Sequence, residues 1–393
     1  MSRPGQFGPE PGGGLPDRIA VGLLTGSFPP ELVERVVARC GREGQRNRLL
    51  TPKVTVYLVL AMCLFPGHGY QEVARKLVRG LAWAGRCTAP GQVPSTAAIS
   101  RARVKLGAEP FRELFAEVVR SAAVEEAGRA GQAGRAGQVG RAGQVGQVGG
   151  VRYRGRRLVA VEGAAIEVPD SAENVAYFGP PEPGGGYPRV RLAALVECGT
   201  GAVAAAATGP SAAAVPNLAR GLFDRLGGGD LLLADQGGFD APAVWRDASA
   251  GGADLLWRVG PDAVLPVRQL LGDGSFLSGF AADGGGRGGG GSGRSTGSAG
   301  APVVRVVEDP SAGEPGRLLT TILDPGRAPA AELAALHGAW RSGARALRDL
   351  AADQLEAVRV LRSRSPEGVE QEVWGHLLVH HALRRLRVSG PDR

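Results

Sequence analysis

The stretch LLLADQGGFD, residues 231–240, places the carboxylate of Asp235 at the end of an apolar run. The run has the length and character of a buried strand. Asp is common in turns because its side chain accepts hydrogen bonds from nearby backbone amides, and this is one interpretation of Asp235. The other is chemical, because active sites collect at the carboxyl ends of strands in α/β sheets. On that interpretation Gly237 and Gly238 let a phosphate backbone come close.

A second carboxylate, Glu162, lies within RRLVAVEGAAIEV, residues 156–168, a stretch that alternates like a strand. If the fold brings the two strands side by side, Glu162 and Asp235 converge. Two carboxylates that share a divalent ion are a usual way to hold Mg²⁺ or Mn²⁺ together with phosphate oxygens. Such a pair supports in-line phosphoryl transfer with two metal ions, and a third carboxylate from a later helix normally completes the site.

Strands and helices alternate around these two carboxylates, which predicts an α/β layered fold. Trp245 and Trp257 fall within apolar periodic segments and are expected in its core. Beyond the strand that carries Glu162, the predicted strands are 189–198, 202–209, 230–238 and 253–261, and the predicted helices are 214–226 and 241–252.

The N-terminal part is predicted to be helical, with helices over 28–40, 51–65, 69–81 and 95–107. Thr51 is the expected N-cap of the second helix, and Ser95 or Thr96 that of the fourth. Arg101, Arg103 and Lys105 give the fourth helix a basic surface. This surface is compatible with a helix-turn-helix-like DNA reader, and equally with a solvated basic face.

Two biased segments and two closing helices complete the chain. Residues 128–150 repeat a unit around Gly-Arg-Ala-Gly-Gln and predict a flexible basic linker, and residues 282–300 predict a second disordered insert. Short strands are expected at 263–267 and 302–309, and helices at 329–355 and 368–388. The last helix holds Trp374, expected in the core, and His376, His380 and His381. An i, i+4 His pair can bind zinc, but a packing or DNA-facing surface is the favoured interpretation.

Composition limits the class of protein. The 393 residues carry a formal net charge of +8, mostly from Arg, which favours a polyanionic partner such as nucleic acid. An Arg-rich surface from a GC-rich genome is the alternative. The four cysteines are far apart, which argues against a zinc finger and a disulfide framework. The sequence shows neither a signal-peptide core nor an apolar run of membrane-spanning length, so we expect a cytoplasmic protein without a membrane partner.

Several separate stretches, in the right order, resemble DDE transposases of the insertion-sequence-four type. They are DRIAVGLLTGSFPPELVERVVARCG, RNRLLTPKVTVYLVLAMCLFPGHGYQEVARKL, VAVEGAAIEVPDSAENVAYFGPP, LLLADQGGFD, LLTTILDP and VRVLRSRSPEGVEQEVWGHLLVHHALRRL. The resemblance implies an α/β fold, in which an RNase H-like core with a β-rich insertion follows an all-α N-terminal domain. The expected divisions are a tail (1–15), a helical DNA-binding domain (16–125), a linker (126–152), the core (153–260 and 326–390) and the insertion (261–325).

The resemblance also implies an activity. Family members bind the terminal inverted repeats of a mobile element and target double-stranded DNA, usually as a homodimer. They cut DNA and join the free 3′ hydroxyl with Mg²⁺ or Mn²⁺ in a two-metal site. Glu162 and Asp235 match the first two catalytic, metal-binding positions. Arg189 and Arg191 are candidate phosphate contacts or ordinary surface charges.

The family's third motif is Tyr, two residues, Arg, three residues, Glu, six residues, Lys, and here it is altered. Counted without gaps, its positions fall on His337, Trp340, Ala344 and Ala351. Ala344 offers no oxygen to a metal, and Glu162 replaces the usual Asp. A substitute ligand would have to come from Asp349, or from Asp353 or Glu356 near it. Two interpretations stay open: an impaired but working transposase, and a catalytically dead remnant that only binds DNA.

Overall fold

A computed structural model describes residues 15–43, 50–83, 93–135, 152–182, 186–235, 239, 241–260, 263–280, 302–309, 316–343, 346–350 and 359–389. The chain forms two compact units. The first, the helical unit, comprises Met1–Ala130, Glu167–Tyr177 and Leu350–Arg393. The second, the sheet unit, comprises Gly131–Ile166 and Phe178–Asp349.

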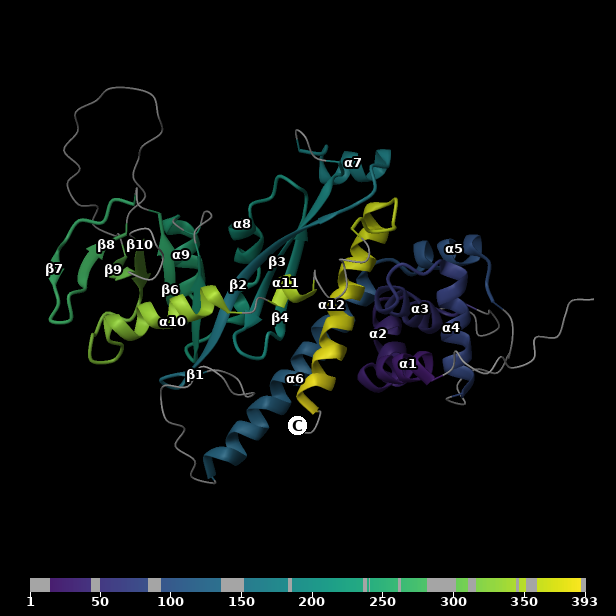
Figure 1. The fold of residues 1–393 in the computed structure, drawn as a ribbon, viewed down its shortest axis with the longest axis horizontal. Coiled ribbons are helices and arrows are strands. Elements are labelled where there is room, and N and C mark those ends of the chain that lie inside the picture. The colour runs from purple at the N-terminus through teal and green to yellow at the C-terminus, as the bar shows by residue number, and fades with distance from the viewer. Residues whose placement is uncertain are drawn as a thin grey trace, which may run out of the picture. The chain divides into compact units, whose positions relative to one another are not determined.

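The helical unit contains α1 (Leu15–Ser27), α2 (Pro30–Arg39), α3 (Pro52–Leu64), α4 (Tyr70–Trp83), α5 (Thr96–Leu106), α6 (Glu109–Arg135), which runs past the unit's boundary, and α12 (Pro366–Ser389) (Figure 1). The predicted caps are confirmed. The Thr51 hydroxyl accepts from the Val54 amide at 3.3 Å, and the Ser95 hydroxyl accepts from the Ala98 amide at 3.3 Å. Each cap satisfies an amide that has no partner inside its helix.

Helix α3 is the centre of the helical unit, because its residues 55–63 are all buried. Helix α12 packs against α3, and the Cys63 thiol lies 3.6 Å from the Glu372 carbonyl oxygen. The sequence-based division assigned residues 326–390 to the core, whereas the structure groups Leu350–Arg393 with the N-terminal helices. Helix α6 also continues to Arg135, so the first part of the predicted linker is helical.

The sheet unit is built on one mixed sheet with the strand order β4-β3-β2-β5-β6-β10-β9-β8-β7, and β1 pairs with β2. Its strands are β1 (Arg152–Tyr153), β2 (Arg156–Glu167), β3 (Arg189–Glu197), β4 (Val203–Gly209), β5 (Asp230–Ala234), β6 (Asp254–Val259), β7 (Gln269–Leu270), β8 (Phe276–Gly279), β9 (Val303–Asp309) and β10 (Gly316–Thr320). Strands β2, β5 and β6 are parallel neighbours, as the alternation of strands and helices predicted.

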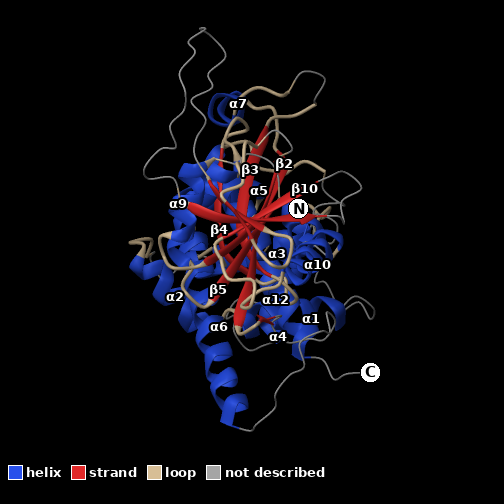
Figure 2. Ribbon diagram, turned by 90° about the vertical axis from the view of Figure 1, so that its left-hand side faces the viewer, coloured by secondary structure: helices blue, strands red, loops and turns tan. Residues whose placement is uncertain are grey.

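Helices cover both faces of this sheet (Figure 2). One face packs on α8 (Val215–Arg220) and α9 (Pro242–Ser249), and its core includes Trp245 and Trp257. The opposite face packs on α10 (Ala330–Ser342) through a core that includes Leu333. Successive strand residues point to opposite faces, so each strand contributes to both cores.

Two expectations in the insertion and after it were wrong. Residues 263–267 do not form a strand, whereas β8, β9 and β10 pair antiparallel and extend the sheet beyond β6. The predicted helix over 329–355 is interrupted, because α10 ends at Ser342 and, among the described residues that follow, α11 covers Ala346–Leu350. Gly343 has extended backbone, with ψ of 176°, which ends the helical path.

Candidate functional site

The pairing of β2 with β5 aligns the two candidate carboxylates. The parallel ladder pairs Val159 with Leu232 and Ala160 with Leu233. Two positions beyond the last pair stand Glu162, still within β2, and Asp235, the residue after β5. Because side chains alternate along a strand, both carboxylates belong to the face on which α10 packs. The prediction that the two strands lie side by side is therefore confirmed, while the roles of Glu162 and Asp235 stay predictions.

The Glu162 carboxylate is held by backbone amides. Its Oε1 accepts from the Ala346 N–H at 3.2 Å, and its Oε2 accepts from the Leu347 N–H at 2.9 Å. These amides belong to the start of α11, where backbone N–H groups have no partner inside the helix. Glu162 is only 5% exposed. Hydrogen bonds to an ionised carboxylate are stronger than neutral ones, so this contact stabilises the start of α11.

Asp235 is held by a guanidinium group. Arg341 Nε, in the last turn of α10, lies 3.0 Å from Asp235 Oδ2. The Asp235 side chain is 26% exposed and that of Arg341 is 30% exposed. The sequence analysis did not single out Arg341. The sequence did contain an indication of its position, because Arg341 lies four residues after His337 and therefore on the same face of the helix.

His337 anchors α10 to the end of β5. Its ring is fully buried, and Nε2 donates to the Ala234 carbonyl oxygen at 3.1 Å. The Trp340 ring meets it edge-on, with centroids 5.1 Å apart. Burial lowers the pKa of His337, against the opposing effects of its bond to Ala234 and of the Asp235 and Asp309 charges. The positions counted as the family's Tyr and Arg are therefore occupied by packing residues.

The described residues do not fit a two-metal site. Nowhere among them do three His, Cys, Asp or Glu side chains gather as a metal-binding group. One carboxylate faces amide donors and the other a guanidinium, and a divalent cation would compete with both for the same oxygens. The other residues expected at the site, Gly237, Gly238, Ala344, Ala351, Asp353 and Glu356, lie outside the described residues, as does the side chain of Asp349.

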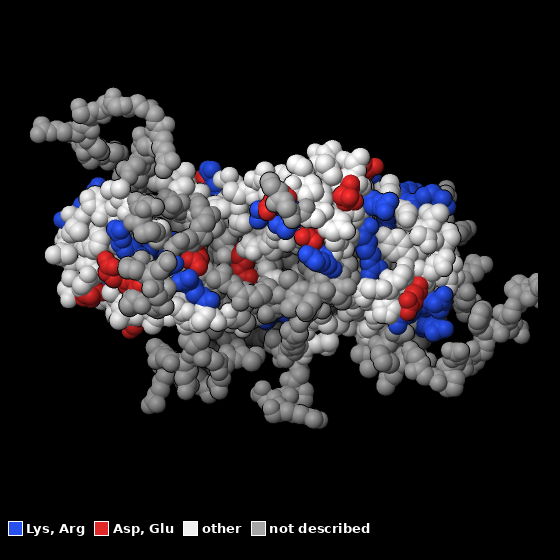
Figure 3. All heavy atoms as spheres, turned by 45° about the horizontal axis from the view of Figure 1, so that its top comes forward, with Lys and Arg blue, Asp and Glu red and all other residues white. Residues whose placement is uncertain are grey.

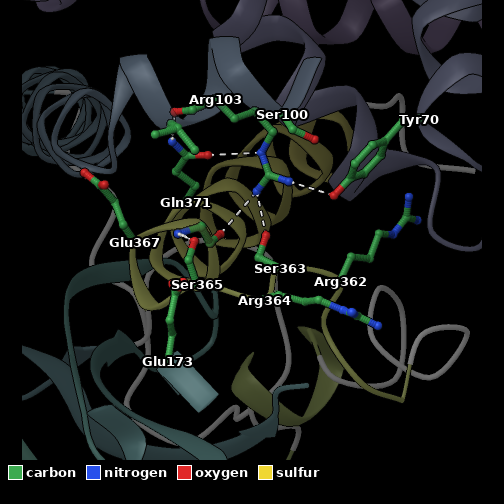
Figure 4. Close-up of a pocket in the computed structure, with 12 residues that line it drawn as sticks. Tyr70, Ser100, Arg103, Glu173, Arg362, Ser363, Arg364, Ser365, Glu367 and Gln371 are labelled. Carbon is green, nitrogen blue, oxygen red and sulfur yellow. Dashed lines mark hydrogen bonds between the residues drawn. The ribbon is translucent and has the colours of Figure 1, made fainter. Parts of the chain in front are cut away.

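Arg103 does not belong to a basic surface, so that prediction was wrong. It is 6% exposed, within the helical unit. Figure 4 shows its guanidinium enclosed by hydrogen-bond partners from α4, α12 and the residues before α12. It donates to Gln371 Oε1 at 3.1 Å, to the Tyr70 hydroxyl at 2.9 Å and to the Ser363 hydroxyl at 2.8 Å. It also pairs with Glu372 at 3.3 Å. Arg103 therefore joins α5 to α12.

The remaining basic candidates differ in their surroundings. Arg101 and Lys105 are exposed, whereas Arg189 and Arg191 both pair with Glu182, at 3.2 and 3.5 Å. Figure 3 shows Lys and Arg side chains in several groups on the face drawn, with Asp and Glu side chains among them. For all four residues, DNA contact stays a prediction.

Two secondary interpretations concerned packing. Trp245, Trp257 and Trp374 are buried, so their expected place in the core is confirmed. His376 and His380 are buried as well, in agreement with the packing interpretation. Burial lowers the pKa of His376 and of His381 to about 4. None of the helices in the described ranges has the length and apolar character needed to cross a bilayer.

Comparison with known proteins identifies the class. Residues 18–116 match the family model of the insertion element 4 transposase N-terminal domain. The chain is 24% identical over 368 residues to the transposase InsG for insertion sequence element IS4 of Escherichia coli (strain K12), which covers 90% of this chain and 74% of that protein. The protein is thus related to transposases. The two matches show that the chain is similar to transposases of the insertion-sequence-four type, in agreement with the motifs in its sequence.

Proposed function

We propose that the protein binds double-stranded DNA at the ends of its insertion sequence, as a transposase does, but is impaired in cutting and joining DNA. The observation that carries this proposal is that the chain itself engages both candidate carboxylates. Two amides of α11 hold Glu162, and Arg341 holds Asp235. A two-metal reaction needs these oxygens for its ions, so their engagement opposes cleavage.

The aligned strands support the RNase H-like interpretation of the sheet unit. Parallel β2 and β5 bring Glu162, within β2, beside Asp235, which follows the carboxyl end of β5, where an α/β enzyme would place catalytic groups. This alignment also favours a second candidate function, a working transposase that uses Mg²⁺ or Mn²⁺ and a displaced third carboxylate. The impaired site is preferred because Arg341 adds a positive charge where that reaction needs a metal. The DNA partner and homodimeric assembly follow from the family and belong to the same proposal.

A binding and nicking assay tests both candidates. The protein is incubated with a duplex that carries the terminal sequences of its own element, in Mn²⁺, beside a duplex of scrambled sequence. Asp235→Ala removes the candidate ligand, and Asp224→Ala, an exposed aspartate of the same unit, is the matched control. We expect preferential binding of the end duplex by all three proteins, and no nicking above the level of Asp235→Ala.

Two results would overturn the proposal. Nicking by the wild type and Asp224→Ala, but not by Asp235→Ala, would establish a working site and favour the second candidate. Equal binding of the end and scrambled duplexes would remove the end-binding function.

A further inference from the structure

The candidate site contains a cation of its own. Arg341 reaches Asp235 from α10, and its guanidinium carries a positive charge. This charge offsets the negative charge of the Asp235 carboxylate, as a metal ion bound to a carboxylate would. A guanidinium 3.0 Å from Asp235 Oδ2 thus stands where a divalent ion bound to Asp235 would place its charge.

The position of Arg341 is built into the fold. His337 and Arg341 are four residues apart on α10 and contact consecutive residues of the β5 end, Ala234 and Asp235. The buried His337 ring fixes the height and rotation of the helix, so Arg341 faces Asp235 without any further adjustment.

We propose that Arg341 is the resident cation of this site and keeps divalent metal ions away from Asp235. The inference rests on the proposed impairment and gives it a cause. A divalent ion at Asp235 would have to displace the guanidinium or tolerate its charge at close range, and either requirement lowers metal affinity. Glu162 gives little compensation, because both its oxygens already accept hydrogen bonds from α11.

Titration with Mn²⁺ in the absence of DNA tests this role, with free Mn²⁺ measured by electron paramagnetic resonance. Arg341→Gln removes the charge and keeps a hydrogen-bond donor. We expect it to bind one Mn²⁺ about tenfold more tightly than the wild type or better. Arg341→Lys keeps the charge and should bind as weakly as the wild type. The double variant Arg341→Gln/Asp235→Asn should lose the gain.

A matched control removes another ion pair of the same unit. Arg220 of α8 pairs with Asp247 of α9 at 2.5 Å, with both side chains more than 40% exposed. Arg220→Gln should leave Mn²⁺ binding unchanged. Circular dichroism of every variant establishes that its fold is retained, so a change in Mn²⁺ affinity reports on the site.

Three results would overturn the proposal: tight Mn²⁺ binding by the wild type, no gain in Arg341→Gln, or a gain that persists in the double variant. These results are independent of the nicking assay. A wild type that does not nick, together with no gain in Arg341→Gln, would leave the proposed function standing and remove Arg341 as its cause. A wild type that nicks would remove the impairment itself.

Discussion

On the strand side of the candidate site, Glu162 lies within the buried strand β2, and Asp235 directly follows the parallel, buried strand β5. On the helix side, Gly343 ends α10 and α11 begins at Ala346. The strand side has the alignment of two carboxylates that the proposed function expects. On the helix side, backbone amides of α11 donate to Glu162, and the guanidinium of Arg341 pairs with Asp235. Under the proposed function, the comparison teaches that two strands can keep their carboxylates aligned while the groups opposite them differ from the family's third motif.

The largest effect is expected on the strand side. Trp257 of β6 is fully buried and meets Trp245 edge-on, with ring centroids 5.0 Å apart. Trp257→Ala should lower the free energy of unfolding of the sheet unit by about 3–5 kcal/mol, because it leaves a large cavity between sheet and helices. Urea unfolding followed by circular dichroism measures the loss. Val264→Ala, at an exposed position of the same unit, should change it little. Similar losses of unfolding free energy in both variants would contradict the view that this core stabilises the strand side.

The same contrast separates what the sequence could predict from what it could not. Strands β2, β5 and β6 were predicted because their apolar runs are long and end at glycine or a charged residue. The adjacency of Glu162 and Asp235 followed from the parallel pairing that such alternation implies. The caps Thr51 and Ser95 were also predictable, because capping depends only on neighbouring residues.

The helix side was not predictable from local pattern. Residues 329–355 have a helical period, and Gly343 inside it was not enough to mark the break. The break is stabilised by Glu162, which lies 184 residues away from Ala346 in sequence. Arg103 was misassigned for the same reason. Its charge indicated a surface, but its partners Gln371 and Glu372 come from the far end of the chain.

A smaller effect is expected where the two sides meet. Glu162→Gln keeps the shape of the side chain but turns one acceptor toward α11 into an N–H donor. The start of α11 should then lose one of its two hydrogen bonds, at a cost of about 1–3 kcal/mol in the free energy of unfolding. Urea unfolding at pH 7 measures the change.

Glu332→Gln is the matched control, because Glu332 makes an exposed pair with Arg154 at 2.9 Å, and such pairs contribute about 1 kcal/mol or less. Glu162→Gln could instead stabilise the protein. That result would mean that the repulsion between the negative charges of Glu162 and Asp235 outweighs the stabilisation by the two α11 amides that bind Glu162. The strand side would then retain its two carboxylates at the expense of stability, as a functional site often does.

The smallest effect concerns pH and the anchor of α10. Burial lowers the pKa of His337 in the folded protein. In the pH range between this lowered pKa and the ordinary His pKa, the ring is neutral in the folded protein and protonated in the unfolded chain. The unfolded chain then binds more protons, and stability falls as the pH drops below about 6.5, the ordinary His pKa. His337→Gln keeps a donor for the Ala234 carbonyl and removes this proton. Its stability should therefore decline less steeply with acid, by at most about 1.4 kcal/mol per pH unit.

Unfolding midpoints of both proteins between pH 7 and pH 5 give the two slopes. His376 and His381, whose pKa values burial also lowers, contribute equally to both and cancel in the difference. Equal slopes would mean that His337 gains its proton in the folded protein as readily as in the unfolded one. The carboxylate of Asp309, 4.0 Å from His337 Nδ1, would then have compensated the burial. In that case the helix side would hold an ion pair under α10 as well as the pair of Arg341 with Asp235 at its end.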